Sequence, residues 1–384
     1  MTAPPNVLII VVDCLAWVLF ESEFAAGNLP TLSELVERGV LFRQAITANT
    51  YTTPAFASLL TGLYSPRHGV QSLRGKRLNP DAPDFVAHLQ KYGYHTEAWV
   101  TGPLHPALGL SRSWDEYDYR DHTDYLLGRD HRHIDWLRAH AGTGPWFALL
   151  HLWEMHHPRQ VLTGVPARGA LEPLYCRSLR SVDVLIGRLA GALDLDRTLI
   201  VVLGDHGENI SWVDYPSRLG KTVHTLRVLA RRRPLRFLRN SHGMHVYEDL
   251  IRIPWIMSGA TLAPGVADHP VSLVDVMPTI TGAIGLPFPQ ESGKTDGMNV
   301  LTGSDSERVL GVFSRPLRKW PRIDCARRSP WKLVKIQDRR TGRTVHSLYN
   351  FAEDPLERTD FKARQPDVFD MLSHELDVLS APAQ

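Results

Sequence analysis

Short, continuous runs of apolar residues constrain the fold of this chain more than any other feature. Asn6–Val12 is the first run, and Pro145–Leu150 and Thr198–Leu203 repeat the pattern. Continuous hydrophobicity of this kind is typical of strands that are covered on both faces, as in a parallel sheet. Amphipathic helical patterns lie between the runs, for example at Leu29–Gly39 and Tyr175–Leu193. This alternation predicts an α/β fold with a doubly wound, mostly parallel sheet flanked by helices.

The C-terminal part of the chain differs in character from the rest. Trp331–Ile336 and Val345–Asn350 predict two antiparallel strands, and Asp367–Leu379 predicts a closing helix. We therefore expect a catalytic domain over residues 1–305, and a smaller α+β subdomain over residues 306–384 that packs on it. This subdomain would hold a small antiparallel sheet and the closing helix.

Composition sets several further expectations. The formal net charge of the 384 residues is +2, so overall charge gives no reason to expect a nucleic-acid partner. Cys14, Cys176 and Cys325 are widely spaced, which favours reduced thiols over a disulfide framework. The apolar stretch Asn6–Phe20 is too short to cross a bilayer and lacks the marks of a signal peptide. We expect a cytoplasmic protein without a transmembrane segment; a homo-oligomer is compatible with the sequence.

Polar side chains follow each of the three apolar runs. Asp13 follows the first, His151 and His156 follow the second, and Asp205 and His206 follow the third. In open α/β sheets ligands bind beyond the carboxyl ends of the strands, so these side chains predict one site. Asp13 would serve equally well as a cap for the next helix.

The stretch Tyr51–Gly62 places two hydroxyl side chains at the start of an expected helix. Pro54 suits the first turn, where its missing N–H costs nothing. Thr52 and Thr53 would then lie at the helix N-terminus, where free backbone N–H groups favour an anion or a developing oxyanion. An ordinary threonine cap accounts for the same residues.

These residues together predict a metal site. Asp13, Asp205, His206 and the hydroxyl of Thr52 form a ligand set for a divalent cation. The imidazole favours zinc or manganese, and calcium remains compatible. Such a set suits displacement at phosphorus or sulfur, with Thr52 as the nucleophile.

Several segments also resemble the sulfatase branch of the alkaline phosphatase superfamily. The resemblance spans nearly the whole chain, and its most specific parts are the nucleophile and Asp-His signatures. The matching segments are Asn6–Asp13, Thr52–Gly62 with Tyr64–Gly69, Gly204–Glu208, His242–Gly243, Tyr247–Glu248, Arg252–Pro254, Val271–Thr279 and Leu348–Pro355.

The departures from this family refine what the resemblance implies. Sulfatases of this type carry a Cys or Ser that becomes formylglycine where this chain has Thr52, and an Arg where it has Phe56. Cys14 replaces a second Asp, and His206 replaces an Asn, which weakens the case for an all-oxygen calcium site. Threonine nucleophiles occur in phosphoryl-transfer members of the superfamily. The resemblance therefore implies a metal-dependent hydrolase of small phosphate or phosphonate esters that forms a covalent phospho-threonine.

The resemblance also suggests roles for two histidines. His156 matches the end of an Asp-Pro-His run, which implies that it protonates the leaving group or binds a substrate oxygen. We expect His242 to be the other catalytic histidine. Thr53, Lys221 and His245 are the expected substrate contacts. A packing role is the alternative for each histidine.

Three other functions remain open at this stage. The protein could transfer a phosphoryl-linked group to an alcohol, or act on sulfate esters with an unmodified threonine. It could also keep the fold without the chemistry, and Phe56 and Cys14 favour that reading. The polar stretch 102–133 is expected to be a surface loop. The arginine-rich stretch 227–239 suits a solvated helical face, an anionic-substrate lid, an interface or a membrane-surface helix.

Overall fold

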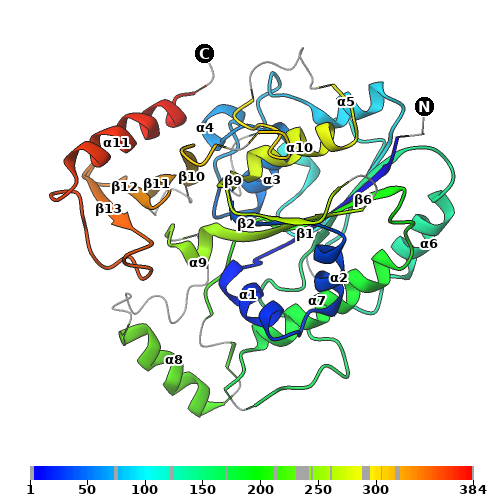
Figure 1. Cartoon of the computed structure of the whole chain (residues 1–384), viewed down its shortest axis with the longest axis horizontal. Helices are drawn as coiled ribbons and strands as arrows, with labels where there is room; N and C mark the ends of the chain where they lie inside the picture. Colours follow the sequence, from blue (N-terminus) through cyan, green and yellow to red (C-terminus); the bar gives the residue numbers. More distant parts are fainter. Residues whose placement is uncertain are drawn as a thin grey trace.

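A mostly parallel sheet runs through the middle of the molecule, with helices on both faces (Figure 1). The computed structural model describes residues 4–72, 77–121, 125–169, 171–210, 214–215, 217–230, 242–243, 245–259, 262–287, 295–303, 305–315 and 321–382. Within these residues the sheet has nine strands, β1 (Asn6–Val12), β2 (Gly39–Ile46), β3 (His95–Val100), β4 (Glu116–Tyr119), β5 (Trp146–Leu152), β6 (Thr198–Gly204), β7 (Arg252–Ser258), β8 (Gly265–Ala267) and β9 (Val271–Ser272).

The strand order confirms the predicted doubly wound arrangement. The order is β4-β3-β5-β1-β6-β7-β2-β8, and β9 also pairs with β2. The strands from β4 to β6 are all parallel, whereas β7 runs antiparallel to both of its neighbours. β1 lies between β5 and β6, so the ends of the three predicted apolar runs come together.

The side chains of β1 explain why the sheet needs a cover on each face. Val7, Ile9 and Val11 point into one apolar core, and their neighbours Leu8, Ile10 and Val12 point into the other. All six side chains are fully buried. Burying such a side chain contributes about 1.5–3 kcal/mol, so this strand stabilises both layers of the fold.

Separate sets of helices form the two covers. The first core is closed by α3 (Thr52–Thr61), α5 (Phe85–Lys91) and α10 (Val276–Ala283), and the second by α1 (Trp17–Ala25), α2 (Pro30–Glu37), α6 (His131–His140) and α7 (Leu174–Ala190). Shorter or peripheral helices are α4 (Ser65–His68), α8 (Arg218–Ala230), α9 (Glu248–Ile251), and the 3₁₀ turns η1 (Pro106–Leu108) and η4 (Leu273–Asp275).

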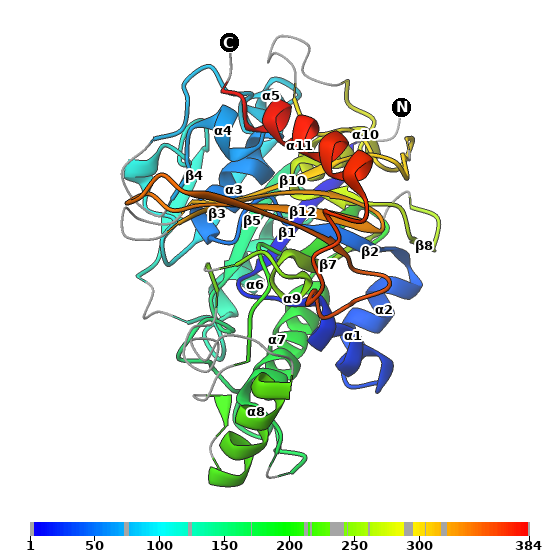
Figure 2. The ribbon, with the colours of Figure 1, turned by 90° about the vertical axis from the view of Figure 1, so that its left-hand side faces the viewer.

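A second, antiparallel sheet lies at one side of the molecule, under the C-terminal helix (Figures 1 and 2). Its strands follow the order β10 (Leu310–Ser314), β11 (Arg322–Arg328), β12 (Trp331–Gln337) and β13 (Thr344–Asn350). The helix α11 (Pro366–Ser380) packs on β11 and β12. The predicted small sheet and closing helix are therefore present. The boundary between residues 305 and 306 remains our prediction.

The structure corrects two details of the sequence reading. The stretch 102–133 is not entirely loop, because Glu116–Tyr119 forms β4 at the edge of the large sheet. Its residues are polar or aromatic and none is fully buried, so the apolar pattern of an inner strand is missing. The small sheet has four strands rather than two, because β11 buries charged side chains that hide its strand character. Residues 231–239 of the arginine-rich stretch lie outside the described residues.

Among the residues described, no helix is both long enough and apolar enough to cross a membrane.

Candidate active site

The carboxyl ends of β1, β5 and β6 bring the predicted acidic and imidazole side chains together. Val12 is in register with Leu152 on one side and with Gly204 on the other, so the residues that follow these strands are neighbours. Asp13 and Asp205 are both buried. Asp13 does not cap the next helix, whose N-cap residue is Ala16. It is free to take part in a site.

Thr52 brings its hydroxyl to these strand ends from the first residue of α3. Tyr51, rather than a threonine, is the N-cap residue of this helix. The Oγ1 of Thr52 donates to Oδ2 of Asp13 at 3.0 Å and lies 3.4 Å from Nε2 of His206. The hydroxyl therefore faces the acidic cluster, and the cap interpretation of Thr52 is wrong.

The buried atoms around Thr52 fit a divalent cation. Oδ1 of Asp13 and Oδ2 of Asp205 are buried without a hydrogen-bond partner among the described residues. Leaving such an oxygen unpaired costs about 1–3 kcal/mol or more for a charged group, and a cation would remove that cost. The Nε2 of His151 lies 3.5 Å from Oδ2 of Asp13, and His151 also belongs to a compact cluster with the two aspartates.

The two carboxylates have opposite pKa shifts. Burial would raise the pKa of Asp13, but the hydrogen bond with His151 and the charges of His156 and His206 lower it below its usual range. Burial, followed by repulsion from Asp13, raises the pKa of Asp205 well above its usual range. A carboxylate oxygen of Asp13 lies within 4.8 Å of one of Asp205. Two buried carboxylates this close repel each other unless one is protonated or a cation lies between them.

His206 is oriented so that one ring nitrogen faces the cluster. Its Nδ1 donates to the carbonyl of Gly207 at 2.9 Å. The Nε2 atom, near Thr52, then keeps its lone pair, which is the form that binds a metal. Burial and the charge of His242 lower the pKa of His206, so burial favours this neutral form.

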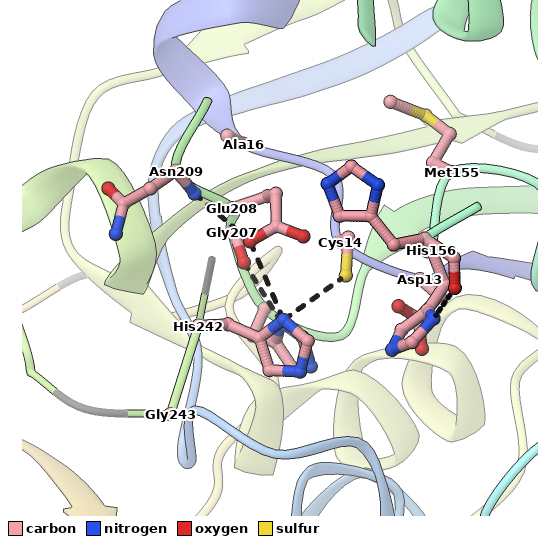
Figure 3. Close-up of polar contacts among 12 residues, drawn as sticks. Asp13, Cys14, Ala16, Met155, His156, Gly207, Glu208, Asn209, His242 and Gly243 are labelled. Atoms are coloured by element: carbon pink, nitrogen blue, oxygen red, sulfur yellow. Dashed lines mark hydrogen bonds and ion pairs between the residues drawn. The ribbon is translucent and has the colours of Figure 1, made fainter. Parts of the chain in front are cut away.

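A second cluster lies beside the first and contains Cys14, Glu208 and His242 (Figure 3). Nδ1 of His242 lies 3.5 Å from Oε1 of Glu208 and 3.9 Å from Sγ of Cys14. Burial would lower the pKa of His242, but the charge of Glu208 raises it. The structure therefore places His242 in this cluster, and its catalytic role remains a prediction. Glu208 was not predicted as a site residue, although it ends the Gly204–Glu208 motif that signals this region.

His156 lies at the edge of these clusters. Its ring stacks on Trp153 with centroids 3.9 Å apart, and it meets the ring of His242 edge-on at 5.5 Å. Nδ1 of His156 donates to the carbonyl of His157 at 2.8 Å, which leaves Nε2 for another partner. Burial lowers the pKa of His156, so its neutral form is favoured near neutral pH, and its protonated form is a stronger acid than an ordinary imidazolium.

The three expected substrate contacts are less closely connected to the site. The hydroxyl of Thr53 donates to the carbonyl of Pro103 at 3.0 Å. His245 is buried and pairs with the amide of Asn209, the residue after Glu208. Lys221 is exposed on α8, and within the described residues its side chain makes no contact with the clusters.

Phe56 occupies the place where the family pattern has an arginine. Its side chain is fully buried and meets the ring of His151 edge-on, with centroids 4.8 Å apart. Phe56 therefore adds packing behind the cluster rather than a positive charge within it.

Comparison with known proteins gives a family match over most of the chain. The sulfatase family profile matches residues 5–286. Choline-sulfatase from Rhizobium meliloti (strain 1021) is 23% identical over 434 aligned residues, which cover 94% of this chain and 82% of that protein.

Solved structures share the fold. The phosphonate monoester hydrolase of Agrobacterium radiobacter matches with a TM-score of 0.73 at 18% identity, covering 98% of this chain and 95% of that one. A protein solved with its substrate, D-glucosamine-2-N,6-O-disulfate, matches with a TM-score of 0.70 at 15% identity, covering 98% and 97%. At these identities the structural matches concern the fold alone.

Proposed function

From the premise that this chain belongs to the sulfatase family, we propose that it hydrolyses phosphate or phosphonate esters with Thr52 as the nucleophile. The observation that carries the proposal is the hydroxyl of Thr52 itself. It lies 3.0 Å from Asp13, at the first residue of α3, where a formylglycine enzyme would need a Cys or Ser. Threonine supports covalent catalysis by its alcohol without modification.

The residues around Thr52 have complementary roles in this proposal. Asp13, Asp205, His206 and Thr52 would hold a divalent cation, with zinc or manganese favoured by the imidazole and calcium compatible. Such a cation lowers the pKa of the alcohol and balances charge on the transferred group. The free N–H groups at the start of α3 favour an anion at the same place.

The reaction proceeds in two displacements. Thr52 loses its proton to bulk water, and its Oγ1 forms a bond to phosphorus while the ester P–O bond breaks. His156, in its protonated form, gives a proton to the departing oxygen. Water then attacks the phospho-threonine, gives its proton to His156, and releases the product as Thr52 regains a proton. His242 binds an oxygen of the transferred group, and its raised pKa favours the charged form that does so.

A sulfate ester is the second candidate substrate. The match to choline-sulfatase covers 94% of this chain, and the name of that protein refers to a sulfate ester. A panel of aryl phosphate monoesters, phosphate diesters, phosphonate esters and sulfates, each with added manganese, zinc or calcium, separates the candidates. We expect the highest kcat/KM on a phosphorus ester. A clear preference for sulfates would contradict the proposal.

Transfer to an alcohol is the alternative outcome of the same chemistry. The same phospho-threonine would be cleaved by an acceptor alcohol instead of water. Product analysis with and without added small alcohols distinguishes the two. We expect the product of water attack in both cases: phosphate from a monoester, a phosphate monoester from a diester, and phosphonate from a phosphonate ester.

Replacing Thr52 gives the direct test of the nucleophile. Thr52→Ala should lower kcat by about 10⁴-fold or more, because no other group can form the covalent intermediate. Asp13, Asp205 and His206 remain, so bound metal measured by elemental analysis should persist.

Thr61→Ala is the matched control for Thr52→Ala. Thr61 lies at the other end of α3, where its hydroxyl, within the described part of the chain, bonds to the backbone of Ala57 and Leu63. It should keep near-normal kcat. Retained turnover in Thr52→Ala would exclude this mechanism.

A further inference from the structure

Helix α8 carries an unusual set of exposed apolar side chains. Among the described residues, Leu219, Leu226 and Leu229 are the three most exposed large hydrophobic side chains, with 59%, 60% and 52% of their surface accessible. Their spacing of seven and three residues puts them on one side of the helix. An apolar stripe of this kind on a single helix marks a surface that binds something.

The opposite side of α8 packs against the protein. Gly220, His224 and Val228 are buried at intervals of four residues. The ring of His224 lies 5.3 Å from that of Tyr215, and a side chain added at Gly220 would meet the Tyr215 ring at 2.7 Å. Because this face is fixed to the body, the leucines point away from it. The helix itself projects from the molecule (Figures 1 and 2).

Positive charge accompanies the apolar stripe. Arg218, Lys221 and Arg227 give the helix three positive charges and it contains no acidic residue, whereas the whole chain has a net charge of only +2. The chain continues with five more arginines up to Arg239, which lie outside the described residues. Exposed leucines combined with local basic charge are typical of helices that lie on anionic lipid surfaces.

We propose that α8 docks on an anionic lipid bilayer. Leu219, Leu226 and Leu229 would enter the boundary between head groups and acyl chains. Arg218 and Lys221 would remain at the level of the lipid phosphates. Charge complementarity selects this occupant, since the basic residues next to the leucines would repel a second copy of the same helix.

The position of α8 also links the bilayer to the candidate active site. A cavity of about 190 Å³ lies between α8 and α1. Val18, Leu19 and Val228 form apolar parts of its wall, and Glu208 and Arg227 form polar parts. Glu208 is the same residue that contacts His242 in the second cluster. A substrate ester with an apolar group would fit this cavity; this extension rests on the proposed function, whereas the docking does not.

Vesicle flotation tests the docking with the full chain. Vesicles of phosphatidylcholine alone are compared with vesicles that also contain phosphatidylglycerol. We expect binding to the anionic vesicles only, weakened by salt. The double variant Leu226→Glu/Leu229→Glu and the double variant Arg218→Glu/Lys221→Glu should each lower binding by more than about tenfold.

Val378→Glu is the matched control, because Val378 is 46% exposed on the distant helix α11. It should bind like the unchanged protein. Equal binding by all variants, or no binding to anionic vesicles, would overturn the proposal. So would a lipid-free dimer, seen by size exclusion, that Leu226→Glu/Leu229→Glu dissociates.

Turnover of a water-soluble phosphate ester separates this proposal from the proposed function. Leu226→Glu/Leu229→Glu should keep that turnover while losing vesicle binding. Thr52→Ala should lose turnover while keeping vesicle binding. Each proposal can therefore fail without the other.

Discussion

Adjacent threonines at the start of α3 differ because their hydroxyls meet different neighbours. The hydroxyl of Thr52 reaches Asp13, whereas that of Thr53 donates to the carbonyl of Pro103. Successive residues of a helix point about 100° apart, so one position decides which of them faces the strand ends. For this geometric reason we propose Thr52, and not Thr53, as the nucleophile.

His68 is a buried residue that supports α3 from the next short helix. Its Nε2 lies 3.0 Å from Oγ of Ser58, and its Nδ1 accepts from the backbone N–H of Val70 at 3.1 Å. Burial lowers the pKa of His68 to about 3, from 6.5. The imidazole is therefore neutral in the folded protein, and the acceptor role of Nδ1 requires that form.

We predict that His68 makes folding stability depend on pH. The unfolded chain binds a proton at His68 below pH 6.5, while the folded chain does so only near pH 3, so stability falls as pH drops through this window. When the pH is lowered from 7 to 5, the free energy of unfolding should fall by about 2 kcal/mol less in His68→Gln than in the unchanged protein. Urea unfolding at the two pH values measures this difference.

The control for His68 is His131→Gln. His131 is exposed at the start of α6, so its replacement removes a histidine without altering the interior. It should lose as much stability as the unchanged protein. Equal losses in His68→Gln and the unchanged protein would mean that His68 is not held neutral by burial.

At the scale of elements, the segment before α9 brings His242 to the site, and it depends on a glycine. Gly243 has a φ of +78°, and a Cβ at this position would meet the ring of Tyr51 at 2.4 Å. Its carbonyl accepts from the hydroxyl of Tyr51 at 2.9 Å and from that of Ser314 at 3.2 Å. The close approach fixes the backbone next to His242.

We predict that Gly243→Ala damages both folding and activity. The left-handed backbone costs about 1 kcal/mol for alanine, and the clash adds about 2 kcal/mol. Relief of the clash would move His242 away from Glu208, and a shift of about 1 Å can lower kcat/KM by about 10²-fold. Thermal unfolding and steady-state kinetics measure the two effects.

Gly93→Ala separates backbone strain from the clash. Gly93 has a φ of +83°, but a Cβ there would meet nothing within 4 Å. The free energy of unfolding of this variant should fall by about 1 kcal/mol, and its activity should be unchanged. If Gly243→Ala lost no more stability and no more activity than Gly93→Ala, the contact with Tyr51 would have no role in the site.

At the scale of the whole molecule, the small sheet supports the segment that leads into Thr52. Phe313 of β10 donates its N–H to the carbonyl of Ala48, and Thr50 donates to Ser314 at 2.7 Å. An apolar cluster joins Val312 and other residues of the small sheet to β2 and α9. These contacts support our proposal that residues 306–384 are a subdomain packed on the catalytic domain. We expect the folding of this subdomain to depend on the catalytic domain.

Lys332 on β12 links the small sheet to α9 and to the segment before it. Its Nζ donates to the carbonyl of Val246 at 2.9 Å and to Glu248 at 3.1 Å, and it also pairs with Glu357. We predict that Lys332→Met destabilises the protein by about 3–5 kcal/mol, because the fully buried carboxylate of Glu357 loses its cation, whereas Glu248 keeps Arg327. Chemical denaturation measures the loss of stability. Activity should also fall, because Lys332 holds the carbonyl of Val246, the residue after the expected substrate contact His245.

Lys335→Met on the same strand is the matched control. Lys335 pairs with Asp377 at 3.0 Å, but the aspartate side chain is 68% exposed. Its loss should change stability by less than about 0.5 kcal/mol. A similar loss of stability in both variants would show that burial does not strengthen the ion pairs of Lys332.

The sequence alone was enough to predict the sheet and the polar residues that follow its strands, whereas metal binding by these residues remains a prediction. Continuous apolar runs require cover on both faces, and parallel strands place their following residues at one edge, so Asp13, Asp205 and His206 had to meet. Thr52 was also predicted, since helix-start signals are local.

Tertiary structure decided the rest. Cys14 and His242 are 228 residues apart, and no local pattern brings Glu208 between them. The direction of each side chain depends on packing from distant segments, which is why Thr53 turned to Pro103 and Lys221 stayed in solvent. The free apolar face of α8 follows from the same cause, because only the folded body determines which side of a helix is covered.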